Sequence, residues 1–237
     1  MGAALLTVKN LSAWYSDEKM VLSDFSLELA EQEAVGLIGL NGAGKTTFLK
    51  VLSGLLPTFR SEGILYFGRP VTPREQRFKM CRYTVFAEDN SFPYFTFREY
   101  LSYVFSAYKK EIPDVSELVR GFHFGDNTDI LLKDLSTGNR KKVFLITAFA
   151  LKPQLLFLDE PVNGLDFQST EYLYQQIAGY KEYGTILFSS HILESITLTS
   201  DRVLVLESGR IKKTFEHGKS QINAADIREA LRYENDI

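Results

Sequence analysis

A glycine-rich loop at residues 39–47 restricts the fold of this chain more than any other stretch. Its letters, GLNGAGKTT, fit the pattern G-x-x-x-x-G-K-[ST], in which backbone N–H groups surround a polyphosphate. An apolar run at residues 34–38 precedes the loop, and apolar residues at helical spacing follow it at residues 47–53. Strand, glycine loop and helix is the setting that such a loop requires. The candidate phosphate-binding residues are Gly39, Asn41, Gly42, Ala43, Gly44, Lys45, Thr46 and Thr47.

The polar side chains at the end of this loop match the chemistry of a nucleoside triphosphate. Lys45 brings a positive charge to the β- and γ-phosphates, and the Thr46 hydroxyl is a ligand for Mg²⁺. A helix that begins near Gly44 adds the positive end of its dipole. We therefore expect ATP and Mg²⁺ as ligands.

The composition is that of a globular chain with no excess of basic residues. The chain has 237 residues, is 45% hydrophobic and carries a net charge of −3, so we expect no nucleic-acid partner. Cys81 is the only cysteine, which excludes an intrachain disulfide. The first residues lack a secretory signal, and the longest apolar run, residues 143–151, is far shorter than the ~20 residues that cross a bilayer. We expect a cytosolic protein.

Apolar patterns predict the remaining architecture as one α/β domain over residues 1–237. We expect strands at residues 6–8, 27–29, 63–67, 82–86, 155–158, 185–188 and 202–206. We expect helices at residues 73–80, 96–121 with a break near Pro113, 136–151 and 167–180. This alternation implies a parallel sheet covered by helices, with antiparallel strands early and a helical insert at about residues 88–134.

Two carboxylates, Asp159 and Glu160, directly follow the apolar residues 155–158. Ligands bind at the carboxyl ends of strands in α/β sheets. In that position Asp159 can hold Mg²⁺ through water, and Glu160 can orient or deprotonate a water that attacks the γ-phosphate. The alternative is a pair of solvated loop acids, which the phosphate loop in the same chain disfavours.

Residues 135–139, LSTGN, resemble the signature LSGGQ of the ATP-binding-cassette (ABC) ATPases. The other motifs of that family follow in order: the strand ending in Asp159 and Glu160, then the letters NGLD at 163–166, then SSH at 189–191. The resemblance covers nearly the whole chain. The chain is similar to a nucleotide-binding subunit of a small bacterial exporter. It implies a P-loop NTPase (RecA-like) parallel-sheet core with an N-terminal antiparallel β subdomain and an inserted helical subdomain.

The resemblance also implies roles for residues outside the phosphate loop. Ser136 is a good N-cap, and Gly138 lets the backbone approach a ligand, so the helix start forms an anion site. In the family this site meets the γ-phosphate bound by a second subunit, and Asp166 lies in a loop that crosses the same interface. His191 would contact the γ-phosphate and hold Glu160 and the water in position.

Two further positions match the family less closely: the aromatic ring that stacks on adenine and the glutamine of the glutamine loop. Tyr15 lies where the family stacks an aromatic ring on adenine, with Trp14 as the alternative. Ala87 takes the place of the family's loop glutamine, and alanine can neither ligate Mg²⁺ nor hydrogen-bond water. Glu88 is therefore a candidate metal ligand after a shift of one residue.

Aromatic residues are dense between residues 86 and 108. They are Phe86, Phe92, Tyr94, Phe95, Phe97, Tyr100, Tyr103, Phe105 and Tyr108. Packing inside a helical subdomain explains most of them, and the remainder could form a pocket for a partner's helix. The family receives the coupling helix of its membrane subunit in this region.

The function implied by the resemblance is ATP hydrolysis that energises a separate membrane-spanning subunit through ATP-driven dimer closure. The expected partners are that membrane subunit and a second nucleotide-binding subunit, most simply an identical chain. The expected location is the cytoplasm, peripheral on the inner face of the cell membrane. The alternative is a soluble ABC ATPase of the iron–sulfur-assembly type, which has a similar length.

Overall fold

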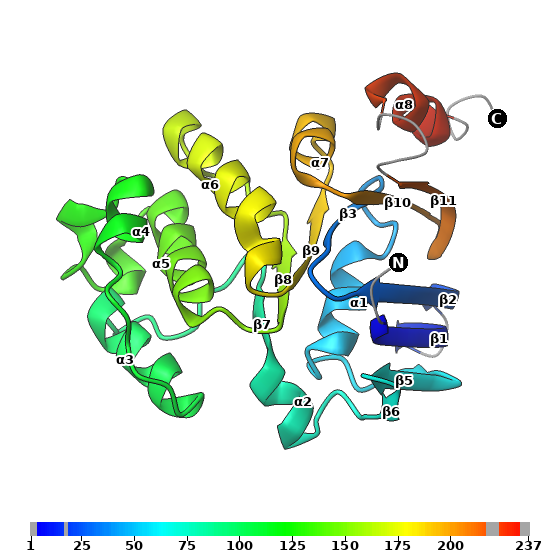
Figure 1. Cartoon of the computed structure of the whole chain (residues 1–237), viewed down its shortest axis with the longest axis horizontal. Coiled ribbons are helices and arrows are strands. Elements are labelled where there is room, and N and C mark those ends of the chain that lie inside the picture. Colours follow the sequence, from blue (N-terminus) through cyan, green and yellow to red (C-terminus); the bar gives the residue numbers. More distant parts are fainter. Residues whose placement is uncertain (1–3, 17–18, 217–222, 233–237) are drawn as a thin grey trace.

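A computed structural model describes residues 4–16, 19–216 and 223–232, and its strands form two sheets (Figure 1). The larger sheet has the order β11-β10-β3-β9-β8-β7. All neighbouring strands in it are parallel except β11, which pairs antiparallel with β10. Its strands are β3 (Ala34–Ile38), β7 (Arg82–Val85), β8 (Leu155–Asp159), β9 (Thr185–Ser190), β10 (Arg202–Glu207) and β11 (Arg210–Glu216).

The second sheet is antiparallel and is built mainly from the start of the chain. Its order is β2-β1-β5-β6, with β4 also paired to β1. Its strands are β1 (Ala4–Ser16), β2 (Lys19–Ala30), β4 (Phe59–Arg60), β5 (Gly63–Tyr66) and β6 (Arg69–Pro70). The expected early antiparallel strands are confirmed, but β1 and β2 are much longer than residues 6–8 and 27–29, because exposed polar residues interrupt the buried apolar ones along both strands.

The helices cover both faces of the larger sheet. They are α1 (Lys45–Leu52), α2 (Gln76–Cys81), α3 (Phe97–Ala107), α4 (Ser116–Gly121), α5 (Thr137–Leu151), α6 (Phe167–Gly179), α7 (Leu193–Thr199) and α8 (Ala224–Arg232). Short 3₁₀ turns lie at Gly125–Asn127, Leu132–Asp134 and Tyr180–Glu182. The helix expected at residues 96–121 is interrupted as predicted, with Pro113 between α3 and α4. The strand β11 and the helices α7 and α8 were not predicted.

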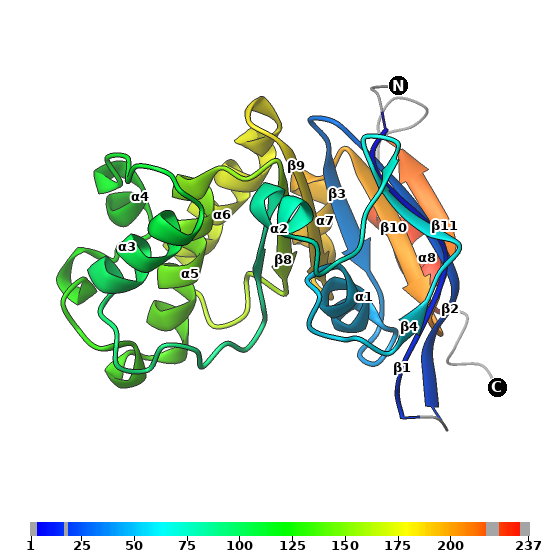
Figure 2. The same cartoon turned by 90° about the horizontal axis from the view of Figure 1, so that it is seen from below.

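Side chains of the central strands alternate between two apolar cores. Leu155 and Phe157 of β8 belong to the core that also holds α1 and the antiparallel sheet, whereas Leu156 and Leu158 face the core under α5 and α6. Because both faces are covered, every residue of β3, β8 and β9 is buried. Figure 2 shows α1 between the two sheets. The helices α3 and α4 lie at the end of the molecule opposite the antiparallel sheet.

Residues 86–108 divide between the core and the surface. Phe97, Tyr100 and Phe105 are buried, while Tyr94 and Tyr103 are 73% and 51% exposed. The α/β fold class expected from the sequence is confirmed, with one antiparallel edge strand in the larger sheet. No helix within the described ranges is both long and apolar enough to cross a membrane.

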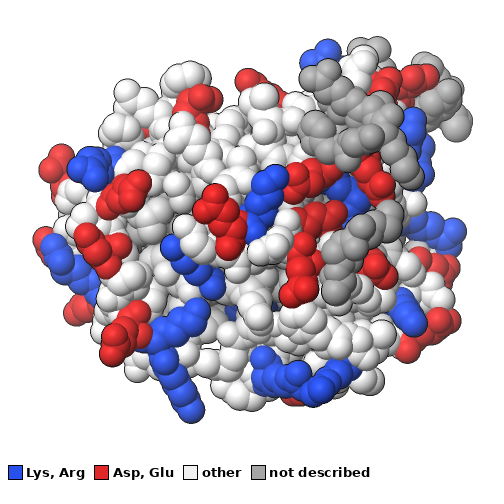
Figure 3. Space-filling model, in the orientation of Figure 1, with Lys and Arg blue, Asp and Glu red and all other residues white. Residues whose placement is uncertain are grey.

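On the face in Figure 3, basic and acidic side chains are interspersed among uncharged ones.

Candidate nucleotide-binding site

The glycine-rich loop connects the carboxyl end of β3 to the first turn of α1. Gly44 precedes the helix with φ +110°, and a Cβ at this position would lie 2.6 Å from Leu22 Cδ2, so only glycine fits. The loop borders a hollow of about 350 Å³. The hollow is lined by Tyr15, Lys19, Val21, residues 41–47 and Glu160. It therefore combines backbone N–H groups at a helix start with one aromatic ring, which is a suitable environment for a nucleotide phosphate chain.

Lys45 is buried beneath this loop. Its Nζ donates to the Gly39 carbonyl at 2.7 Å and lies 3.4 Å from Glu160 Oε1. The ammonium thus already has oxygen partners of the kind that a phosphate would provide. A bound γ-phosphate would compete with Glu160 for this cation.

Asp159 lies at the end of β8, where two hydroxyls meet its carboxylate. Thr46 Oγ1 donates to Asp159 Oδ2 at 2.8 Å, and Ser189 Oγ donates to Oδ1 at 2.7 Å. Both donors are side chains whose oxygens, like carboxylate oxygens, suit Mg²⁺. Within the described residues no group of three or more His, Cys, Asp or Glu side chains could hold a metal by itself. Thr46 and Asp159 therefore fit a metal that shares its ligands with phosphate oxygens and water.

Glu160 is held in an unusual backbone conformation. Its φ is +46°, in the left-handed region, which costs a non-glycine residue about 1–3 kcal/mol. Its N–H donates to Ser189 Oγ at 3.0 Å, and its Oε2 lies 2.8 Å from His191 Nδ1. The buried carboxylate is thus fixed from both sides, by Lys45 and by His191.

Tyr15 stands at the rim of the hollow. Its ring is 53% exposed, its hydroxyl accepts from Thr47 Oγ1 at 3.4 Å, and Lys50 Nζ lies 5.6 Å from the ring centre. The exposed ring can accept a planar base. Trp14, the alternative, does not line the hollow.

Ser136, Gly138 and Asp166 lie outside the hollow of the phosphate loop. Ser136 Oγ caps α5 by accepting from Asn139 N at 3.2 Å, and Asp166 Oδ1 caps α6 by accepting from Ser169 N at 2.8 Å. Ser136 and Asp166 are exposed. Burial works against ionisation of Asp166, but hydrogen bonds from Lys142 and Ser169 outweigh it and hold its pKa well below the usual range.

Comparison with known proteins places this site in a family. The family model described as ABC transporter matches residues 22–163. The chain belongs to the ABC transporter family. AlbC of Bacillus subtilis (strain 168), named as an ABC transporter ATP-binding protein, is 34% identical over 98% of this chain and 100% of its own length. The phosphate import ATP-binding protein PstB of Aeropyrum pernix is 31% identical over 86% of this chain and 87% of its own length.

Solved structures agree with the family assignment. One described as the ATP binding subunit of an ABC transporter is 29% identical, with a TM-score of 0.80 over 95% of this chain and 92% of the other. The chain is thus an ATP-binding subunit of the ABC family, which hydrolyses ATP to power transport. These relatives do not favour the alternative of an iron–sulfur-assembly ATPase.

The segment expected to correspond to the ABC glutamine loop follows β7. Ala87 and Glu88 border a separate hollow of about 230 Å³ between the end of β7 and the start of α5, together with Arg140 and Lys141. Glu88 is exposed and does not line the phosphate-loop hollow. Glu88 thus lines this second hollow and not the phosphate-loop hollow.

Sequence reasoning missed three side chains that contact the ABC motifs. Ser189 was read only as part of a motif, yet its hydroxyl bridges Asp159 and the Glu160 backbone. Lys141 and Lys142 were overlooked, although both ammonium groups reach the loop that follows β8. The sequence did hold a sign of these contacts, because two adjacent lysines directly precede the apolar residues 143–151. A charge buried beside such residues needs a partner.

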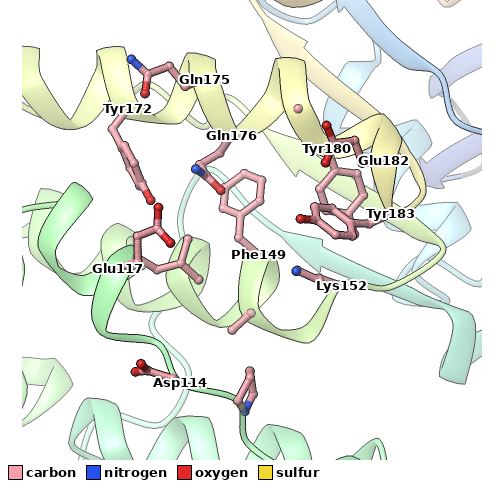
Figure 4. Close-up of a pocket in the computed structure, with 14 residues that line it drawn as sticks. Asp114, Glu117, Phe149, Lys152, Tyr172, Gln175, Gln176, Tyr180, Glu182 and Tyr183 are labelled. Atoms are coloured by element: carbon pink, nitrogen blue, oxygen red, sulfur yellow. The ribbon is translucent and has the colours of Figure 1, made fainter.

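A further hollow of about 330 Å³ lies at the carboxyl ends of α5 and α6. Figure 4 shows side chains of α4, α5 and α6 facing it, including Glu117, Phe149 and Gln176. Lys152 Nζ lies over the Tyr183 ring, 3.7 Å from its centre. This hollow shares no lining residue with the phosphate loop and is not part of the ABC site.

Proposed function

We propose that this chain hydrolyses ATP as one half of an ATP-closed dimer and thereby drives a separate membrane-spanning subunit. One observation supports the proposal: the phosphate loop and the exposed start of α5 lie at different places, as the two halves of a shared nucleotide site would require. Lys45, Asp159 and Glu160 converge at the phosphate loop. Ser136 caps an exposed helix start outside that hollow, where a second copy's nucleotide could reach it.

The proposed chemistry follows from the contacts of Glu160. Its carboxylate is buried, hydrogen-bonded to His191, and paired with Lys45. When Lys45 moves to the phosphates, one carboxylate oxygen is released to orient or deprotonate the attacking water, while His191 keeps the other oxygen in place. Thr46 and Asp159 would hold Mg²⁺, which neutralises charge on the phosphates, and Glu88 is a further candidate ligand.

Tyr15 is proposed to stack on the adenine, because its ring is exposed at the rim of the same hollow. Gly39 and residues 41–47 would surround the phosphates with N–H groups. Gly138 and Asp166 would lie at the interface with the second copy.

The membrane partner is proposed to dock on the helical segment at about residues 88–134. Tyr94 and Tyr103 are exposed there beside the half-buried Phe92 and Phe95, and aromatic side chains are common interface anchors. Such docking would place the chain on the inner face of the cell membrane. Export is the direction we favour, from the resemblance to small bacterial exporters.

The test is ATP-dependent dimerisation, measured by light scattering. Glu160→Gln should bind ATP, hydrolyse it at least ~100-fold more slowly and accumulate as a dimer. Adding Ser136→Arg puts a bulky cation at the helix start and should abolish that dimer while the monomer still binds ATP. Wild-type turnover in Glu160→Gln, or an unchanged dimer with Ser136→Arg, would contradict the proposal.

A further inference from the structure

We infer that Lys141 and Lys142 clamp the loop from Glu160 to Asp166, so that α5 positions the Glu160 of its own chain. The inference rests on the proposed role of Glu160. It assigns positioning roles to two residues that do not line the phosphate-loop hollow. Through them, the helix start that faces a second copy's nucleotide would be joined to the water-activating carboxylate of the first.

The two lysines hold opposite ends of the loop. Both lie near the start of α5, and they are only 4% and 3% exposed. Lys141 Nζ donates to the Glu160 carbonyl at 3.3 Å, and Lys142 Nζ donates to Asp166 Oδ2 at 2.6 Å. One helix turn thus binds the residue that follows β8 and the residue that caps α6.

The middle of the loop is pressed against the same helix. A Cβ on Gly138 would lie 2.1 Å from the Gly164 carbonyl oxygen, closer than any real contact allows. The missing side chain of Gly138 thus allows close approach of a loop of the same chain. Within the loop, Asn163 N donates to the Glu160 carbonyl at 3.2 Å. The three contact points leave the loop little freedom to move independently of α5.

The position of Glu160 explains why such a clamp matters. Its left-handed backbone is strained and must be maintained by its surroundings. The carbonyl bound by Lys141 belongs to this residue, so a shift of Lys141 changes the peptide plane next to the carboxylate-bearing residue. Lys142 adds an ion pair to Asp166, whose carboxylate also accepts from Ser169. A displacement of α5 would therefore reach Glu160 through backbone contacts alone.

Three carboxylates lie near the Lys141 ammonium, and a hollow borders it. Burial lowers the pKa of Lys141, while the nearby carboxylates of Asp159, Glu160 and Glu88 oppose that shift. Lys141 also borders the hollow next to Ala87, where the family's glutamine is missing. An ammonium among three carboxylates both balances their charge and contacts Glu160.

The experiment compares Lys141→Met and Lys142→Met, which keep side-chain length without charge, with Lys79→Met on the exposed face of α2 as the matched control. The clamp predicts that kcat falls at least about 10-fold in the first two, equivalent to ~1.4 kcal/mol of transition-state stabilisation. The KM for ATP should change less than about 2-fold because the phosphate loop is untouched. Lys142→Arg, which can still pair with Asp166, should recover most of the activity.

A structural role alone would give a different pattern. In the Glu160→Gln background, Lys141→Met should still form the ATP-bound dimer, whereas general damage to α5 would abolish it. The double variant Asp166→Asn/Lys142→Met should be no slower than the slower single variant, because each change alone already removes the same ion pair between Lys142 and Asp166. If the methionine variants do not fold, Lys141→Gln and Lys142→Gln serve in the same assays.

Three results would overturn the inference. They are wild-type kcat in both lysine variants, a raised KM that accounts for the whole loss, and multiplicative effects of Lys142→Met and Asp166→Asn. Glu160→Gln is measured in parallel. Normal turnover there overturns the proposed function and the clamp together, whereas slow Glu160→Gln with normal lysine variants overturns the clamp alone.

Discussion

Asp159 and Thr46 show how single side chains can prepare a site for its ligands. The hydroxyl of Thr46 and the carboxylate of Asp159 are hydrogen-bonded across the gap between α1 and β8. The hydrogen bond thus holds the two groups proposed to share a cation close together. The prepared contact lowers the amount of rearrangement required when a nucleotide arrives.

Thr46→Val should raise the Mg²⁺ concentration needed for half-maximal hydrolysis by roughly 10-fold or more, because it removes one oxygen ligand. Thr46→Ser retains the hydroxyl and should stay close to the wild type. Mg²⁺ titrations of ATPase activity measure the difference. Equal half-maximal concentrations for Thr46→Val and Thr46→Ser would show that this hydroxyl does not hold the cation.

Glu88 offers a second test at the level of one residue. If Glu88 has taken over the glutamine's contact with Mg²⁺ or water, Glu88→Ala should hydrolyse ATP more slowly and need more Mg²⁺. Ala87→Gln should then change the rate little. Identical Mg²⁺ titrations for the wild type and Glu88→Ala would rule out the takeover.

Individual elements differ in how well they were predicted, and the reason is physical. The strand before the phosphate loop and the strand before Asp159 are buried on both faces, so uninterrupted apolar runs mark them. By contrast, β11 reads RIKKTFE and is mostly solvent-exposed, so it has no apolar pattern to detect. The motif residues could be found from their order, but the partners of Lys141 and Lys142 could not. A sequence does not say which distant carbonyl or carboxylate a buried ammonium reaches.

Strand β9 is the element whose packing should matter most for stability, because it lies between β3 and β8. Leu187→Ala removes a fully buried side chain in the core beneath α1 and should cost about 2–5 kcal/mol of unfolding free energy. Leu198→Ala on α7, where the side chain is 62% exposed, is the control and should cost far less. Urea unfolding measures both, and equal losses would contradict the assigned core.

At the scale of the whole molecule, three pieces of chain far apart in sequence meet at the carboxyl ends of neighbouring strands in the larger sheet. The phosphate loop follows β3, the two carboxylates follow or end β8, and Ser189 and His191 belong to or follow β9. The antiparallel sheet and the helices α3 and α4 lie at opposite ends of the molecule (Figures 1 and 2). The rim proposed to accept a base and the surface proposed to accept a partner are therefore well separated.

The acid sensitivity of the molecule should include a contribution from Asp166. Its pKa lies below the ordinary 3.8 in the folded chain, so the unfolded chain binds the proton more readily. The stabilisation is complete above that value and is lost as the pH falls below it. Between about pH 5 and about pH 3, the wild type should therefore lose more unfolding free energy than Asp166→Asn. Urea unfolding across this range checks it, and parallel pH profiles would contradict the assignment.

The pairing of β3 has a consequence for how the protein is made. This strand is hydrogen-bonded to β9 and β10, which are translated long after it, and to no strand that directly follows it. While the ribosome adds the intervening residues, the stretch that carries the phosphate loop has no sheet neighbours, and such non-local pairing is slow. A chain that stops before residue 185 has the motif but lacks both strands that pair with β3. Incomplete products should therefore be unable to consume ATP.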